Sequence, residues 1–193
     1  GMAIRFNEND SRMMGRTASG VKGIDLAQGN HVVGMVRCLQ EDTTELLTVT
    51  ENGYGKRTPL CEYLVQTEDG STRTQGRGGK GRRDIKTNSR NGNVVALLSV
   101  TDNDGLMLIS TGGMIVRISA DTIRQTSRGT QGVRVINLSK DDKLAGIARI
   151  LDGNDDNQET EDAPSDASPA PSTEPASEDT SATQVTEENS PSE

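Results

Sequence analysis

Residues 106–118 read Leu-Met-Leu-Ile-Ser-Thr-Gly-Gly-Met-Ile-Val-Arg-Ile, which is two short apolar runs separated by Thr-Gly-Gly. Apolar, partly β-branched runs suit strands, and a Gly-Gly turn between them favours a hairpin because tight hairpin turns need positive φ. Residues 46–58 repeat this arrangement around Glu-Asn-Gly. We find no sustained helical periodicity, and residues 120–125 are predicted to form at most one helical turn. The sequence therefore predicts an all-β fold.

Three blocks of sequence recur with a period of roughly 50–60 residues. They are a hairpin block, a block rich in glycine and arginine, and an apolar block. Their copies begin at Gly1, Gly53 and Gly113, at Arg16, Arg77 and Arg128, and at Val32, Val94 and Leu144. Units of about four short antiparallel strands at this period indicate propeller-like blades, about three of them, over about 1–40, 41–101 and 102–151. The first unit lacks a counterpart of residues 46–50, so we expect the chain to be a fragment.

Cations occupy matched positions in the aligned units, and we expect them to form a stripe of positive charge on successive blades. No aromatic residues interleave with them, which disfavours stacking on single strands and favours duplex DNA held by its phosphates. The alternative is that these arginines make edge-strand contacts or solvated surface. The candidate DNA-binding residues are Arg5, Arg16, Lys22, Lys56, Arg57, Arg77, Lys80, Arg82, Arg83, Arg117, Arg128 and Arg134.

The most cationic copy of the glycine–arginine block reads Gln-Gly-Arg-Gly-Gly-Lys-Gly-Arg-Arg over residues 75–83. Glycine lets a polyanion approach the main chain closely. The spacing Gly-x-Gly-x-x-Gly also matches a dinucleotide-binding fingerprint, but the flanking segments are polar and do not form the strand and helix which that motif requires. We recognise no catalytic arrangement in the chain. The candidate loop comprises Gln75, Gly76, Arg77, Gly78, Gly79, Lys80 and Gly81.

The net charge of −8 conceals two oppositely charged parts. From Asp152 onward there are 13 acidic residues and no Lys or Arg, which leaves 21 basic and 16 acidic residues, a charge of about +5, in residues 1–151. Basic domains favour polyanions. Residues 152–193 also hold five of the six prolines, so we predict a disordered acidic tail. The tail is either a solubilising appendage or a tethered competitor for the basic surface.

Other features of the sequence argue against a metal site, a membrane-spanning segment and a signal peptide. Cys38, Cys61 and the single His31 lack metal-ligand spacing, so we predict no metal site and interpret the cysteines as structural thiols. No apolar run approaches the ~20 residues that span a bilayer, and we find no signal peptide. We expect a cytoplasmic protein.

The motifs over residues 52–58, 75–81 and 128–134 resemble the C-terminal domain of the DNA gyrase A family. The similarity extends over residues 1–150, and an acidic tail is also typical of that family. The resemblance implies the last half of a six-bladed β-pinwheel whose basic rim wraps double-stranded DNA in a positive sense.

The resemblance further implies a non-catalytic part of a type II topoisomerase on the bacterial nucleoid. The implied protein partners are the N-terminal region of gyrase A and the gyrase B protein, in an A2B2 heterotetramer. No cofactor is implied for this chain, whereas ATP and Mg²⁺ are implied for a holoenzyme that introduces negative supercoils.

The sequence departs from the family pattern at three places. Gly76 replaces a cation of the family's box, Arg82 replaces a valine, and Asp84 replaces an uncharged residue. The box also belongs to the first blade in the family, whereas this copy lies in the penultimate blade. Two alternatives stay open: the equivalent C-terminal domain of topoisomerase IV, and a propeller that mainly binds proteins.

Overall fold

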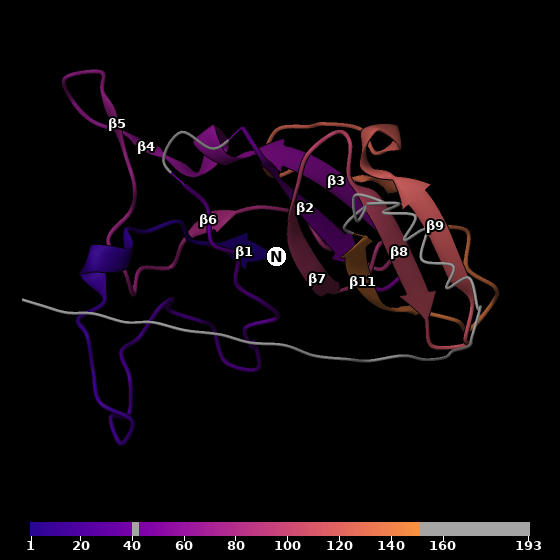
Figure 1. Cartoon of the computed structure of the whole chain (residues 1–193), viewed down its shortest axis with the longest axis horizontal. Helices are drawn as coiled ribbons and strands as arrows, with labels where there is room; N and C mark the ends of the chain where they lie inside the picture. Colours follow the sequence, from indigo (N-terminus) through magenta and orange to yellow (C-terminus); the bar gives the residue numbers. More distant parts are fainter. Residues whose placement is uncertain (40–42, 151–193) are drawn as a thin grey trace, which may run out of the picture. The chain divides into compact units, whose positions relative to one another are not determined.

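The computed structural model describes residues 1–39 and 43–150, which lie in one compact unit, Gly1–Asn154 (Figure 1). All regular structure in these residues is β-strand or short 3₁₀ helix, so the predicted all-β class is confirmed. The predicted acidic tail lies outside the described residues. No helix in the described part of the chain is long and apolar enough to cross a membrane.

The second unit supplies three strands of a four-stranded antiparallel sheet in the order β10-β3-β2-β7, and β10 (Val133–Arg134) comes from the third unit. Strands β2 (Glu45–Thr50) and β3 (Tyr54–Pro59) are the predicted hairpin, and Gly53 in their turn has a φ of 77°. Strand β7 (Val94–Val100) pairs along the other edge of β2. The hairpin prediction is confirmed here.

The third unit repeats this hairpin with β8 (Gly105–Ser110) and β9 (Ile115–Ser119), and β11 (Leu144–Ile150) pairs with the other edge of β8 (Figure 1). The 3₁₀ helix η3 (Ala120–Thr122) follows β9 and confirms the predicted single turn. One apolar core joins the second and third units, which explains why neither hairpin needs a helix to cover it. Its buried residues are Leu47, Val49, Val100, Leu106, Leu108, Ala120, Ile123, Ile136 and Leu144.

The first unit has less regular structure. It contains β1 (Met2–Ala3) and η1 (Glu8–Asp10), and residues 32–36, which align with β7 and β11, form no strand. The reason is pairing: β7 and β11 are held by β2 and β8, and residues 1–39 include no counterpart of those two strands.

Each later unit contributes one strand to the unit before it, and we call this the exchanged strand. Strand β6 (Arg82–Arg83) of the second unit pairs with β1, and β10 (Val133–Arg134) of the third unit pairs with β3. Figure 1 shows β6 beside β1. Each exchanged strand belongs to a glycine–arginine block, so the exchange fixes where the cations of that block lie. The second unit is completed by η2 (Leu60–Tyr63), β4 (Val65–Gln66) and β5 (Thr72–Arg73).

Candidate DNA-binding surface

The three glycine–arginine loops, residues 16–24, 77–85 and 128–136, are joined by hydrogen bonds that repeat at matched positions. Gly78 N donates to the Gly23 carbonyl at 2.7 Å. One unit further on, Gly129 N donates to the Asp84 carbonyl at 2.6 Å. Gly78 and Gly129 are matched, as are Gly23 and Asp84, so each loop is offset from the preceding one in the same way.

A second repeated bond runs in the opposite direction. Asp25 N donates to the Gly79 carbonyl at 2.8 Å, and Lys86 N donates to the Thr130 carbonyl at 2.9 Å. These four residues again occupy two matched pairs of positions. Two-way backbone bonding of this kind fixes the register between neighbouring loops, as it does in a sheet.

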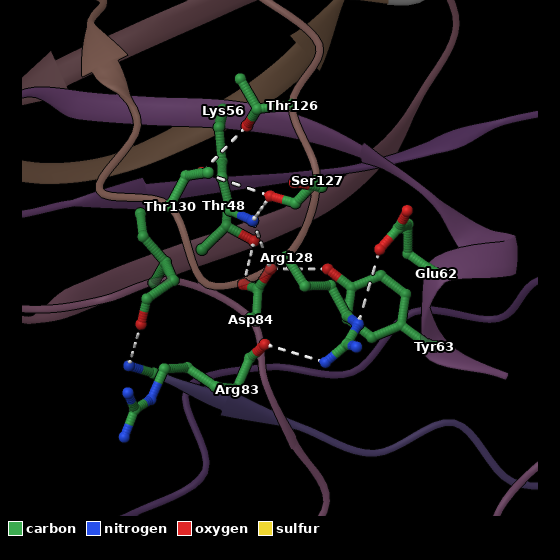
Figure 2. A network of polar contacts seen from close by, with 12 residues as sticks. Thr48, Lys56, Glu62, Tyr63, Arg83, Asp84, Thr126, Ser127, Arg128 and Thr130 are labelled. Atoms are coloured by element: carbon green, nitrogen blue, oxygen red, sulfur yellow. Dashed lines mark hydrogen bonds and ion pairs between the residues drawn. The ribbon is translucent and has the colours of Figure 1, made fainter. Parts of the chain in front are cut away.

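The first arginine of each later loop holds the loop before it. Arg77 donates through Nη1 to the Lys22 carbonyl and through Nε to the Asp10 carbonyl at 3.0 Å. Arg128 donates through Nη1 to the Arg83 carbonyl at 3.3 Å (Figure 2). Lys22 and Arg83 are themselves matched. Arg77 and Arg128 therefore have a positioning role in addition to any contact with a ligand.

Each loop has an exposed cation two residues after a matched glycine, which is Gly20, Gly81 or Gly132. Lys22 keeps 64% of its side chain exposed while pairing with Asp25 at 2.9 Å, and Arg83 and Arg134 are exposed on their exchanged strands. Cross-strand pairing is equivalent for the last two, because Arg83 lies opposite Met2 and Arg134 lies opposite Tyr54. These three cations have the repeated, solvent-facing arrangement that the sequence predicted for a positive stripe.

The arginine that follows the hairpin glycine does not share this arrangement in the second unit. Arg57 is buried, with Nη1 paired to Glu45 at 3.1 Å and to Asp102, and with Nε donating to the Ile123 carbonyl at 2.7 Å. We therefore correct the prediction that Arg57 contacts DNA. Its donors are directed at Glu45 of its own unit and at Asp102 and Ile123 of the next unit, not at solvent.

Arg5 and Arg117 are the counterparts of Arg57. Arg5 is half-buried and donates through Nη1 to the Leu60 carbonyl of the following unit at 3.0 Å, as Arg57 does to a carbonyl of the unit after it. Arg117 is exposed. This series thus joins units wherever the described residues include a following unit.

Lys56 lies at the centre of a buried polar network (Figure 2). Its Nζ lies 3.2 Å from Oδ1 of Asp84 and donates to the Ser127 carbonyl at 3.1 Å. Tyr63 donates to Oδ1 of Asp84 at 2.5 Å, and Thr48 donates to Oδ2 at 2.7 Å. Lys56 is 0% exposed, so the prediction that it contacts DNA is also corrected: its charge is neutralised inside the protein.

Burial determines the protonation behaviour of this network. Desolvation lowers the pKa of Lys56, against the opposing attraction of Asp84. Desolvation also raises the pKa of the Tyr63 phenol, and the neighbouring Asp84 carboxylate raises it further. Tyr63 therefore acts as a neutral donor to Asp84.

The other candidate residues divide into exposed and engaged cations. Arg16 and Lys80 are exposed. Arg82 is half-buried and donates through Nη1 to the Leu64 carbonyl. The loop that contains Lys80 is attached to the first unit, because Gln75 N donates to the Arg5 carbonyl at 3.0 Å.

Repeat matching did not select Arg90, which is exposed. It lies in the connection from Ile85 to Val94, which spans nine positions, whereas the matched connections from Ile24 to Val32 and from Ile136 to Leu144 span eight. The alignment of this connection with its counterparts is therefore not fixed, and the sequence marks Arg90 only by its charge.

The described residues contain no group of three or more His, Cys, Asp or Glu side chains that could hold a metal ion. Cys38 is half-buried, Cys61 is exposed, and both are free thiols.

The blades, together with the repeated hydrogen bonds between the glycine–arginine loops, define a β-pinwheel. Its units exchange strands, and these exchanged strands carry repeated cations. The model of the DNA gyrase C-terminal domain, a β-propeller family, matches residues 1–38, 44–70, 73–101 and 106–150. The chain belongs to this family.

Individual relatives agree with this assignment. The chain is 42% identical to the DNA gyrase A protein of Staphylococcus aureus strain MRSA252 over 158 residues, which cover 82% of the chain and 17% of the relative. For strain NCTC 8325 / PS 47 the identity is 42% over 166 residues, covering 86% of the chain and 18% of the relative. The chain therefore spans less than a fifth of the length of these relatives.

Two solved structures share the fold. The C-terminal domain of DNA gyrase A matches with a TM-score of 0.65 and 27% identity, over 78% of this chain and 48% of that structure. The C-terminal domain of DNA topoisomerase IV matches with a TM-score of 0.66 and 20% identity, over 78% of this chain and 44% of that structure. The second likeness concerns the fold alone, and the relatives at 42% identity favour gyrase over topoisomerase IV.

Proposed function

We propose that this chain binds double-stranded DNA by its phosphates and bends it along the glycine–arginine loops, as part of a gyrase A protein. The observation that carries the proposal is the exposed series Lys22, Arg83 and Arg134, one cation in each loop. Matched hydrogen bonds between the loops set the spacing of this series. Repeated cations at a fixed spacing suit a regular polyanion, and they read its charge without reading its sequence.

The same proposal assigns the chain a place in a larger enzyme. A holoenzyme of gyrase A and gyrase B, in an A2B2 arrangement, would use DNA wrapped on this domain to introduce negative supercoils, with ATP and Mg²⁺ acting outside this chain. We place it in the bacterial cytoplasm, on the nucleoid. The family membership and the gyrase A relatives support this assignment.

Duplex binding at graded salt tests the proposal. We expect the complete 193-residue chain to bind a duplex with an affinity that falls steeply as salt rises, and to bring dyes at the two duplex ends closer together. Binding that ignores salt, or binding without any bend, would contradict it. Recruitment of a protein in the absence of DNA affinity would favour the protein-binding alternative instead.

A further inference from the structure

Two arginines meet on one tyrosine where β3 receives the exchanged strand β10. The Tyr54 hydroxyl accepts from Nε of Arg90 at 3.1 Å and from Nη2 of Arg134 at 3.0 Å. The two guanidinium carbons lie 5.1 and 5.4 Å from the centroid of the tyrosine ring. Tyr54 is itself buried, so it is a fixed platform for both cations.

The two positive charges have no acidic partner among the described residues. The one further side-chain bond of the pair is from Nη1 of Arg134 to the neutral Oδ1 of Asn137, at 3.3 Å. Lys22 and Lys143, by contrast, are paired with Asp25 and Glu51. Two uncompensated guanidinium groups on one hydroxyl repel each other, and an anion between them would relieve that repulsion.

The two arginines also affect the ionisation of Tyr54. Its hydrogen bonds from Arg134 and Arg90 lower the pKa of the Tyr54 phenol, because both favour the phenolate. Both guanidinium groups thus direct one donor each at the same oxygen atom.

Hydrogen bonds within the protein hold the loop that presents Arg90. Asn88 Oδ1 accepts from Arg90 N at 3.0 Å, and Asn52 Nδ2 donates to the Arg90 carbonyl at 3.1 Å. Asn91 is buried and donates to the carbonyls of Lys86 at 2.9 Å and Gln131 at 3.1 Å. A cation whose backbone is fixed loses less conformational entropy on binding.

The other exchanged strand lacks this arrangement. Arg83 lies opposite Met2, which is 48% exposed, and Met2 offers neither a ring nor a hydroxyl. The paired cations are therefore specific to the junction of the second and third units.

We infer that Arg90 and Arg134, held together by Tyr54, form a two-arginine grip for one phosphodiester group of the DNA backbone. Each guanidinium group keeps free N–H donors in a planar fork, which matches the oxygens of a phosphate. Because Arg134 belongs to the exposed series, the grip lies on the proposed DNA track and makes this junction its strongest anchor. The inference rests on the proposed function.

A double-mutant cycle tests the grip with the complete 193-residue chain and a duplex, at several salt concentrations. We expect Arg90→Gln and Arg134→Gln each to weaken binding about tenfold, as the loss of a charge-assisted hydrogen bond does. The double variant should lose clearly less than the product of the two losses, because both side chains hold one phosphate. Additive losses would overturn the shared site.

Arg124→Gln is the matched control, since Arg124 is exposed and lies outside the series. If Arg90→Gln has no larger effect than Arg124→Gln, the grip is overturned while the proposed function stands. If the unaltered chain shows no salt-dependent affinity for the duplex, the proposed function itself fails.

Tyr54→Phe separates positioning from folding. It keeps the ring and every charge but removes the shared hydroxyl, so we expect an unchanged thermal midpoint and a several-fold loss of affinity. Tyr54→Met copies the residue opposite Arg83 and should abolish the coupling between Arg90 and Arg134. Coupling that survives Tyr54→Met would show that the tyrosine does not organise the site.

Discussion

Lys56 and Asp84 form a buried ion pair, with Nζ and Oδ1 separated by 3.2 Å and side chains that are 0% and 5% exposed. The matched positions of the first unit hold Ile4 and Gly23, and those of the third unit hold Val116 and Val135. An ion pair therefore occupies, in the second unit alone, two positions that are uncharged in its neighbours.

This pair predicts a strong and non-additive effect on stability. Lys56→Met leaves the Asp84 carboxylate buried without its cation, and Asp84→Asn leaves the ammonium group likewise, so each change should cost about 3–5 kcal/mol of unfolding free energy. The double variant should cost less than the sum by about 1 kcal/mol or more, because it strands neither charge. Denaturant unfolding measures all three values, and strict additivity would show that the two charges do not stabilise each other.

The hairpins and their glycine turns could be predicted from the sequence because apolar runs and positive-φ glycines are local signals. The burial of Lys56 and Arg57 could not. Alternation along a strand places one of two successive side chains in solvent, but β3 is covered on both sides and both residues are buried.

The exchanged strands also could not be predicted from the sequence. They are two-residue strands in polar, glycine-rich loops, Arg82–Arg83 and Val133–Arg134. Neither has the alternating apolar pattern that predicts a strand. Matching the repeats was enough to identify the exposed series Lys22, Arg83 and Arg134. It did not select Arg90, because the connection that holds Arg90 differs in length from the matched connections.

Arg57 and Arg83 should separate stability from DNA contact. Arg57→Met removes a buried cation from Glu45 and from the Ile123 carbonyl, so we expect a loss of about 2–4 kcal/mol in unfolding free energy. The slope of log affinity against log salt should stay unchanged, because Arg57 does not face solvent.

Arg83→Gln should do the reverse. We expect an unfolding free energy within about 0.5 kcal/mol of the unaltered chain, since Arg83 is exposed. The salt slope should fall by about one, for the loss of one phosphate contact. A slope that changes for Arg57→Met but not for Arg83→Gln would reverse our assignment of the two series.

The turn between β4 and β5 should respond to acid. Hydrogen bonds from Thr67 Oγ1, and then from Ser71, lower the pKa of Asp69 to about 2. A carboxyl whose pKa is lowered by folding stabilises the turn above its ordinary pKa of 3.8, and that contribution is lost as the pH falls towards 2. The Ser71 amide, which donates to Asp69 Oδ1 at 3.0 Å, should report the titration in NMR spectra. A midpoint at 3.8 or above would contradict this prediction.

Two glycines of the same loop should tolerate alanine very differently. Gly81 has a φ of 71°, and a Cβ atom there would lie 2.5 Å from the carbonyl oxygen of Ala3. Ala3 belongs to β1, which pairs with β6 directly after Gly81. Gly81→Ala should therefore cost at least about 1–3 kcal/mol, from backbone strain and separation of the two strands. Gly76 has no atom within 4 Å of its Cβ position, so Gly76→Ala should stay within about 0.5 kcal/mol of the unaltered chain. Thermal unfolding compares the two variants, and equal midpoints would show that the close approach of the loop to β1 does not depend on glycine.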